Sequence, residues 1–132
     1  NNPYQARVAV EELSRWVARQ DWPQVLAAYS RCVRITREFE ETFPLDPDRF
    51  VEEASRELYA AYRRCAAQVT PQSSVDDFFH AFLPMIPAIS RFFDDVLVMH
   101  EDRTLRENRL ALLQRIAALP AGIVDLSRLQ GF

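Results

Sequence analysis

The first 121 residues of this chain contain no glycine, and its two glycines, Gly122 and Gly131, both lie near the end. The same stretch is rich in Ala, Leu, Arg and Glu, which favour helices, whereas glycine weakens them. Apolar residues recur at helical spacing, and no segment alternates apolar and polar residues as a half-buried strand does. The sequence therefore predicts an all-α fold. It also excludes a glycine-rich loop that cradles nucleotide phosphates over these residues.

Apolar periodicity and prolines divide the chain into six expected helical segments. These are 3–19, 22–39, a third that starts at 47, a fourth from 75 to about 97, 103–119 and a short one over 124–129. Residue types that cap helix N-termini precede four of the segments: Asp21, Asp46, Ser74 and Asp102. The fourth segment is apolar almost all round, so we expect it to be the most buried element, and its prolines must kink or divide it.

Short connections between helices of this length predict an antiparallel bundle of about five to six helices. The 132 residues suit one domain, 1–132. Since the sequence does not begin with Met, we expect a fragment of a longer chain. No run of 18 apolar residues is present, so no membrane-spanning helix and no membrane partner are expected.

The net charge of −3 argues against a protein that coats nucleic acid through general basic charge. All 16 basic residues are arginine, whose planar guanidinium can make forked contacts to phosphates or base edges. If the chain binds RNA, it must do so through a local arginine patch. Cys32 and Cys65 are too few for a disulfide scaffold and are expected to be reduced and partly buried, as in a cytosolic protein.

No group of residues predicts catalysis or a metal site. Asp94 and Asp95 are adjacent, so on a helix their side chains point about 100° apart and do not share a site. His80 and His100 have no Ser or Cys nucleophile in a recognisable motif nearby, and no pair of ligands has zinc spacing.

Two sets of arginines are spaced by three residues and are candidate RNA contacts. The first triplet, Arg31, Arg34 and Arg37, follows a helix strip roughly 120° wide beside Tyr29, and could hold phosphates or stack on splayed bases. The alternative is a solvated face whose arginines pair with the glutamates at 38, 40 and 41.

The second triplet, Arg103, Arg106 and Arg109, stands at the start of an expected helix, where cations oppose the helix dipole. Cations placed where the helix dipole disfavours them indicate a function. The alternative is that Glu107 and the acidic segment before this helix simply compensate the charge.

Five stretches of the chain resemble glycyl-tRNA synthetase beta subunits of bacteria. Residues 92–99 read FFDDVLVM and are followed at 105–113 by LRENRLALL, similar to a phenylalanine pair, Asp, Val-x-Val-Met, a short acidic turn and Arg-x-Asn-Arg-Leu in that family. The other similar stretches are 26–35 (LAAYSRCVRI), 46–50 (DPDRF) leading to 57–59 (ELY), and 124–129 (VDLSRL). The interruption at 120–122 (PAG) departs from the continuous last helix that the family leads us to expect.

The resemblance covers nearly the whole chain, and it implies the C-terminal, arginyl-synthetase-like helical anticodon-binding domain of such a subunit. It implies binding of glycine tRNA, with aminoacylation carried out by an alpha subunit or a fused alpha region. Under this interpretation the domain itself holds no catalytic residue, cofactor or metal, the parent enzyme uses ATP and magnesium in the cytoplasm, and DNA is not a partner. The expected tRNA-binding residues are Arg31, Arg34 and Arg37 first, and Arg103, Arg106, Asn108 and Arg109 second. The alternative is a helical protein-interaction module that docks on a partner subunit.

Overall fold

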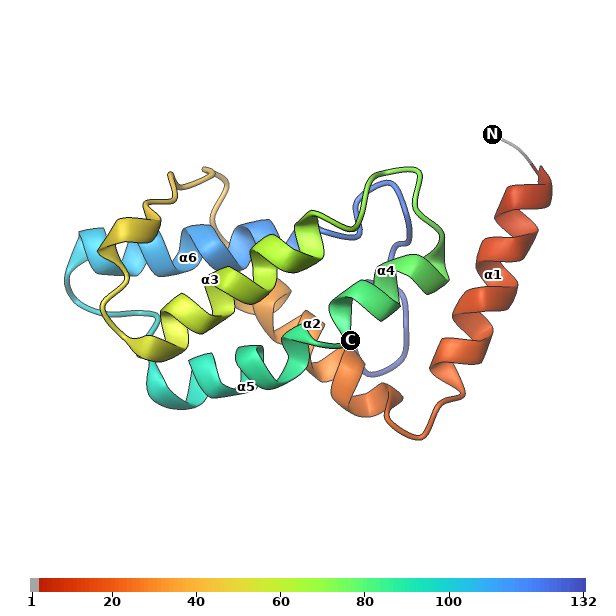
Figure 1. Cartoon of the computed structure of the whole chain (residues 1–132), viewed down its shortest axis with the longest axis horizontal. Coiled ribbons are helices and arrows are strands. Elements are labelled where there is room, and N and C mark those ends of the chain that lie inside the picture. Colours follow the sequence, from red (N-terminus) through yellow and green to blue (C-terminus); the bar gives the residue numbers. More distant parts are fainter. Residues whose placement is uncertain (1–2) are drawn as a thin grey trace.

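The computed structural model describes residues 3–132, which form α-helices and one short 3-10 helix and contain no strand. The elements are α1 (Pro3–Val17), α2 (Trp22–Thr36), η1 (Pro47–Arg49), α3 (Glu53–Ala66), α4 (Val75–Phe82), α5 (Met85–Asp95) and α6 (Arg103–Ala117). α2 packs against α6 and α3 packs against α5, while α1 contacts α4 at one end of the molecule (Figure 1). The all-α prediction is confirmed. Within residues 3–132, no helix combines the length and the apolar character needed to cross a membrane.

The fourth predicted segment does form the centre of the core. Phe78, Phe79, Phe82 and Phe92 are all at most 1% exposed. Pro84 divides the segment as expected, because α4 ends at Phe82 and α5 begins just after this proline. The core therefore rests on aromatic rings from two consecutive helices.

α1 and α2 end earlier than the sequence predicts, at residues 17 and 36. Asp21 stands at the N-cap position of α2, but its side chain does not bond the helix. It pairs instead with Arg19, whose Nε and Nη2 donate to the two carboxylate oxygens over 2.9 and 3.0 Å. Trp16 is buried, and its indole N–H donates to Asp76 over 2.8 Å, which joins α1 to α4. The next residue, Val17, is 41% exposed.

The third helix does not start at Pro47, so that prediction was wrong. Asp46 accepts from the backbone N–H of Asp48 and caps only the 3-10 turn. The chain then runs extended through Phe50 before α3 begins at residue 53. Arg56 donates to the carbonyls of Phe50 and Val51, both over 3.0 Å, so these oxygens are bound by a guanidinium instead of by helix N–H groups.

The short helix predicted over 124–129 is absent, and the chain from 121 to 132 consists of turns and irregular segments. Gly122 has a φ of 83°, and a Cβ there would lie 3.1 Å from the side chain of Pro71, so both backbone and space require glycine. Asp125 then accepts from both the backbone N–H and the hydroxyl of Ser127. Such a local side-chain turn competes with helix hydrogen bonds, which explains why the tail is not helical.

Candidate nucleic-acid interface

The exposed face of α2 carries the first triplet. The opposite face of this helix is buried and includes Cys32 and Leu26, which pack into the core. Arg31, Arg34 and Arg37 are exposed, the last at the C-cap of the helix. Cations at a helix C-terminus are favoured by the helix dipole, so this end of α2 can hold positive charge without a partner.

The three arginines of the first triplet point to different neighbours. The Arg31 guanidinium lies over the ring of Phe93, 4.2 Å from its centroid, at the last turn of α5. Arg34 Nη1 donates to the carbonyl of Phe132 over 3.3 Å, which ties it to the tail. The Arg37 guanidinium has no hydrogen bond or ion pair within residues 3–132. The strip therefore spans the surface from α5 to the chain's last residue.

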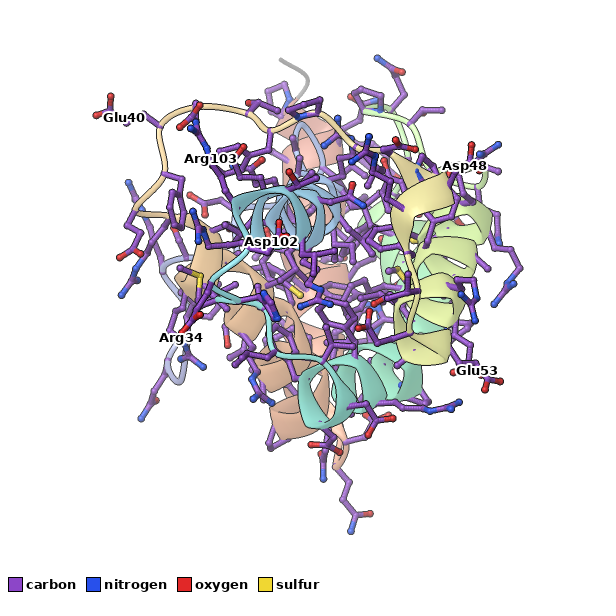
Figure 2. All side chains as sticks on the ribbon, turned by 90° about the vertical axis from the view of Figure 1, so that its left-hand side faces the viewer. Arg34, Glu40, Asp48, Glu53, Asp102 and Arg103 are labelled. Atoms are coloured by element: carbon purple, nitrogen blue, oxygen red, sulfur yellow. The ribbon has the colours of Figure 1, made fainter. Side chains whose placement is uncertain are left out.

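No ion pair among the described residues joins the first triplet to the glutamates at 38, 40 and 41. The alternative interpretation of this strip depended on such pairs. These guanidiniums are thus not neutralised by a carboxylate contact and remain able to bind an anionic ligand. Figure 2 shows the molecule from the left-hand side of Figure 1, with Arg34 directed away from the helices.

Tyr29, which the sequence places beside the strip, is not available for stacking. Its ring is buried and its hydroxyl donates to the carbonyl of Ala117 over 2.7 Å. Burial raises the pKa of Tyr29 to about 12. This residue joins α2 to α6 instead of contacting a ligand.

The second triplet behaves differently from the first. Arg103 is exposed and pairs with Glu107, from Nε to the carboxylate over 2.7 Å, and this hydrogen bond raises the pKa of Arg103 above its usual range. Arg106 donates to the carbonyls of His100 and Glu101 over 3.0 and 3.3 Å. Glu107 therefore compensates one charge, and Arg106 binds backbone carbonyls.

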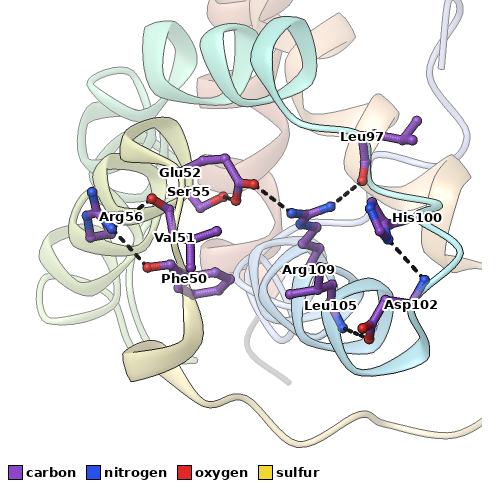
Figure 3. A network of polar contacts seen from close by, with 10 residues as sticks. All are labelled: Phe50, Val51, Glu52, Ser55, Arg56, Leu97, His100, Asp102, Leu105 and Arg109. Atoms are coloured by element: carbon purple, nitrogen blue, oxygen red, sulfur yellow. Dashed lines mark hydrogen bonds and ion pairs between the residues drawn. The ribbon is translucent and has the colours of Figure 1, made fainter.

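Arg109 is buried at 4% exposure and links two connections of the fold (Figure 3). Its Nη1 donates to the carbonyl of Leu97 over 2.6 Å, and its Nη2 donates to the carboxylate of Glu52 over 2.8 Å. The side chain thus holds the segment before α3 against the segment before α6. Sequence reasoning missed Glu52, since nothing in its local pattern distinguishes it from a surface glutamate.

Asn108 is also buried, and it pairs with the backbone of a residue 62 positions away. Its amide oxygen accepts from the N–H of Asp46 over 2.8 Å, and its amide nitrogen donates to the carbonyl of the same residue over 2.9 Å. This two-way contact mimics a strand pair and fixes the loop before η1 on α6. Of the four second-choice residues, Arg103 is exposed, Arg106 is half-buried, and Asn108 and Arg109 are buried.

Residues 3–132 contain no group of three His, Cys, Asp or Glu side chains that could hold a metal ion. Asp94 and Asp95 are both exposed, and Asp95 pairs with Arg91, so these neighbours do not form a joint acid–base site. The free thiols of Cys32 and Cys65 are both buried, as expected, and burial raises their pKa to about 12 and about 11.

Comparison with known proteins relates the chain to one family. A family model described as DALR anticodon binding domain matches residues 25–124. The chain is 32% identical to "Glycine--tRNA ligase, chloroplastic/mitochondrial 2" of Arabidopsis thaliana, over 100% of the chain and 13% of that protein. It is 35% identical to the glycine--tRNA ligase beta subunit of Myxococcus xanthus, over 95% of the chain and 19% of that protein. The corresponding subunit of Moorella thermoacetica is 36% identical over 89% of the chain and 17% of that protein. The chain thus spans less than a fifth of the length of these relatives.

Proposed function

Because the chain belongs to the DALR anticodon binding domain family, we propose that it binds the anticodon region of glycine tRNA as one domain of a glycine–tRNA ligase. The observation that carries this proposal is the first triplet on the exposed face of α2, inside the matched residues and without carboxylate partners. An anticodon loop offers phosphates and unstacked bases, and guanidiniums can bind either through forked hydrogen bonds or stacking.

In this proposal the two triplets have separate roles. Arg31, Arg34 and Arg37 contact the RNA directly, and Arg103 contributes at the edge of the surface after exchanging Glu107 for a phosphate. Arg106, Asn108 and Arg109 contribute indirectly, since their polar groups already bind the loops around α6. They hold the surface in the shape that the RNA meets.

Catalysis lies outside this chain under the same proposal. The ATP and magnesium of the ligase act in the aminoacylating part of the enzyme, an alpha subunit or a fused alpha region, and this domain positions the tRNA for it. We place the ligase in the cytoplasm, although one similar protein is named as chloroplastic/mitochondrial. A net-negative domain fits this division, because the rest of a large synthetase can supply most phosphate contacts.

The experiment replaces Arg34 with Ala in the full-length ligase. The KM for glycine tRNA is expected to rise, while ATP-dependent activation of glycine stays unchanged, because the substitution removes an RNA contact far from the chemistry. Unaltered tRNA kinetics would remove Arg34 from the interface.

The second candidate function is a protein-interaction module that docks on a partner subunit, and the large exposed side chains of Val10 and Val17 on α1 favour it. Titration of the chain with glycine tRNA at two salt concentrations separates the two functions. Salt-sensitive binding that prefers glycine tRNA supports anticodon reading. Absence of binding even at low salt supports protein docking.

A further inference from the structure

The connection between α5 and α6 places two large apolar side chains on the surface. Residues 96–99 alternate in burial: Val96 and Val98 are buried, whereas Leu97 is 66% exposed and Met99 is 46% exposed. Single exposed apolar residues are common, but two on one side of one connection form a small apolar surface that calls for an explanation.

Side chains of α6 bind the backbone of this connection. Arg109 binds the carbonyl of Leu97, and Arg106 binds the carbonyls of His100 and Glu101. Figure 3 shows the Leu97 side chain directed away from Arg109 and from the polar network around it. The backbone on both sides of Met99 is therefore fixed, and a ligand that meets this surface does not have to order it first.

One member of the first triplet lies close to the start of this connection. Arg31 lies over Phe93, in the last turn of α5, only four residues before Leu97. In Figure 2 the connection from α5 to α6 runs between the labelled Arg34 and Arg103, at the end of the molecule away from α1. The connection that carries Leu97 and Met99 thus begins just after Phe93, over which Arg31 lies, and continues to His100, whose carbonyl Arg106 binds.

The charge around this surface is mixed. Glu101 and Asp102 belong to the same connection and are exposed, and the chain as a whole carries −3. Attraction of phosphates by arginine alone is consequently modest here. Binding of an RNA loop needs a further contact that does not depend on charge.

We propose that Leu97 and Met99 form a platform on which one unstacked base of the bound RNA loop packs. The proposal rests on the anticodon-binding function above and adds to it a contact that is not ionic. A base turned out of its stack exposes a flat apolar face, which aliphatic carbons and a polarisable thioether can cover. The first triplet then holds the phosphates or base edges that flank this base.

The experiment measures binding of the glycine tRNA anticodon stem–loop to the full-length protein at several salt concentrations. Leu97→Ser with Met99→Ser is expected to weaken affinity about 5- to 20-fold, toward the lower part of the range for loss of a base-stacking contact. The dependence of affinity on salt should stay unchanged, because no charge is removed. The conservative pair Leu97→Ile with Met99→Leu should bind like the wild type.

Val10→Ser supplies a matched control, since Val10 is 64% exposed on α1 at the other end of the molecule. Its RNA affinity should equal that of the wild type. Urea midpoints of all these variants should also match, because the altered side chains are exposed.

Three results would overturn the platform. If the serine pair binds RNA normally while Arg34→Ala weakens binding, the platform is wrong and the anticodon-binding function stands. If the wild type shows no salt-dependent RNA binding, the function itself fails and the platform with it. If the serine pair binds RNA normally but loses a partner subunit on size-exclusion chromatography, the surface is a protein-docking site.

Discussion

The two arginine triplets have the same spacing on two helices that pack against each other, yet they meet different surroundings. The first triplet ends α2 and is exposed, with one guanidinium over Phe93 and none in an ion pair among the described residues. The second triplet begins α6, and Arg106 and Arg109 turn inward to carbonyl oxygens of the preceding connection. Spacing alone therefore does not decide whether an arginine serves a ligand or the fold.

The position of each triplet along its helix explains the difference. Helical side chains lean toward the N-terminus of their helix. At the start of α6 this direction leads to the connection before the helix, whose carbonyls need donors. At the end of α2 it leads over the helix's own middle turns, whose carbonyls already accept helix hydrogen bonds. Arginines there remain available for a ligand.

The largest effect is expected from Arg109→Ala. The substitution removes a buried guanidinium that joins Leu97 to Glu52, and it leaves that carbonyl and carboxylate without their donor. Breaking a buried pair is strongly destabilising, and since Glu52 is one-third exposed we expect a loss of about 2–4 kcal/mol in the free energy of unfolding. Urea denaturation measures it. Arg103→Ala is the matched control in the same triplet, and it should leave the urea midpoint close to that of the wild type, because exposed ion pairs contribute little to stability. Equal losses in the two variants would erase the distinction between exposed and buried members.

Asn108→Ala is expected to have the next largest effect. It deletes both hydrogen bonds to the backbone of Asp46 and leaves a partly buried N–H and carbonyl without partners. The expected loss in unfolding free energy is about 1–3 kcal/mol, again from urea denaturation. Protection of the Asp46 amide from hydrogen exchange should fall as well. A variant as stable as the wild type would show that this loop is not held through Asn108.

The first triplet should respond in the opposite way. Arg34→Gln or Arg37→Gln is expected to change the free energy of unfolding by less than about 0.5 kcal/mol, because neither side chain is buried or ion-paired. The tRNA affinity should fall in the same variants. A destabilisation comparable to that of Arg109→Ala would mean that this strip, too, belongs to the fold.

The smallest effect concerns the other face of α2. Burial raises the pKa of the Cys32 thiol from 9.0 to about 12, so roughly one thiol in ten thousand is ionised at pH 8. Native protein should therefore resist a thiol reagent at this pH, whereas urea-unfolded protein reacts at once. A raised pKa stabilises the fold below pH 9, and this contribution is lost as pH rises from 9 toward 12. Rapid labelling of Cys32 in the native protein would contradict the burial of this face of α2.

The helices could be predicted from sequence because they depend on local properties. Pro84, Ser74, Asp102 and the aromatic run of α4 and α5 act through neighbours in the chain, and these predictions were confirmed. The end of the chain was predicted wrongly. The turn at Asp125 replaces the expected helix, although only two hydrogen bonds from Ser127 stabilise this turn. Boundaries fail where such local alternatives are nearly balanced.

The site was harder to predict because its contacts join residues far apart in sequence. The partners of Arg109 and Asn108 lie 57 and 62 positions away, and no local pattern indicates them. The sequence predicts a fourth helix to about residue 97, whereas α5 ends at Asp95, so the apolar run that holds Leu97 and Met99 was interpreted as part of a buried helix. Which arginines contact RNA stays a prediction.

The central claim is that the first triplet binds RNA, and salt dependence tests it most directly. The affinity of the full-length protein for glycine tRNA is measured against salt concentration, for the wild type and for a variant with Arg31, Arg34 and Arg37 all replaced by Gln. The account predicts weaker binding and a logarithmic salt slope shallower by roughly 0.7 for each arginine that meets a phosphate, with an unchanged urea midpoint. An unchanged affinity and slope would contradict it.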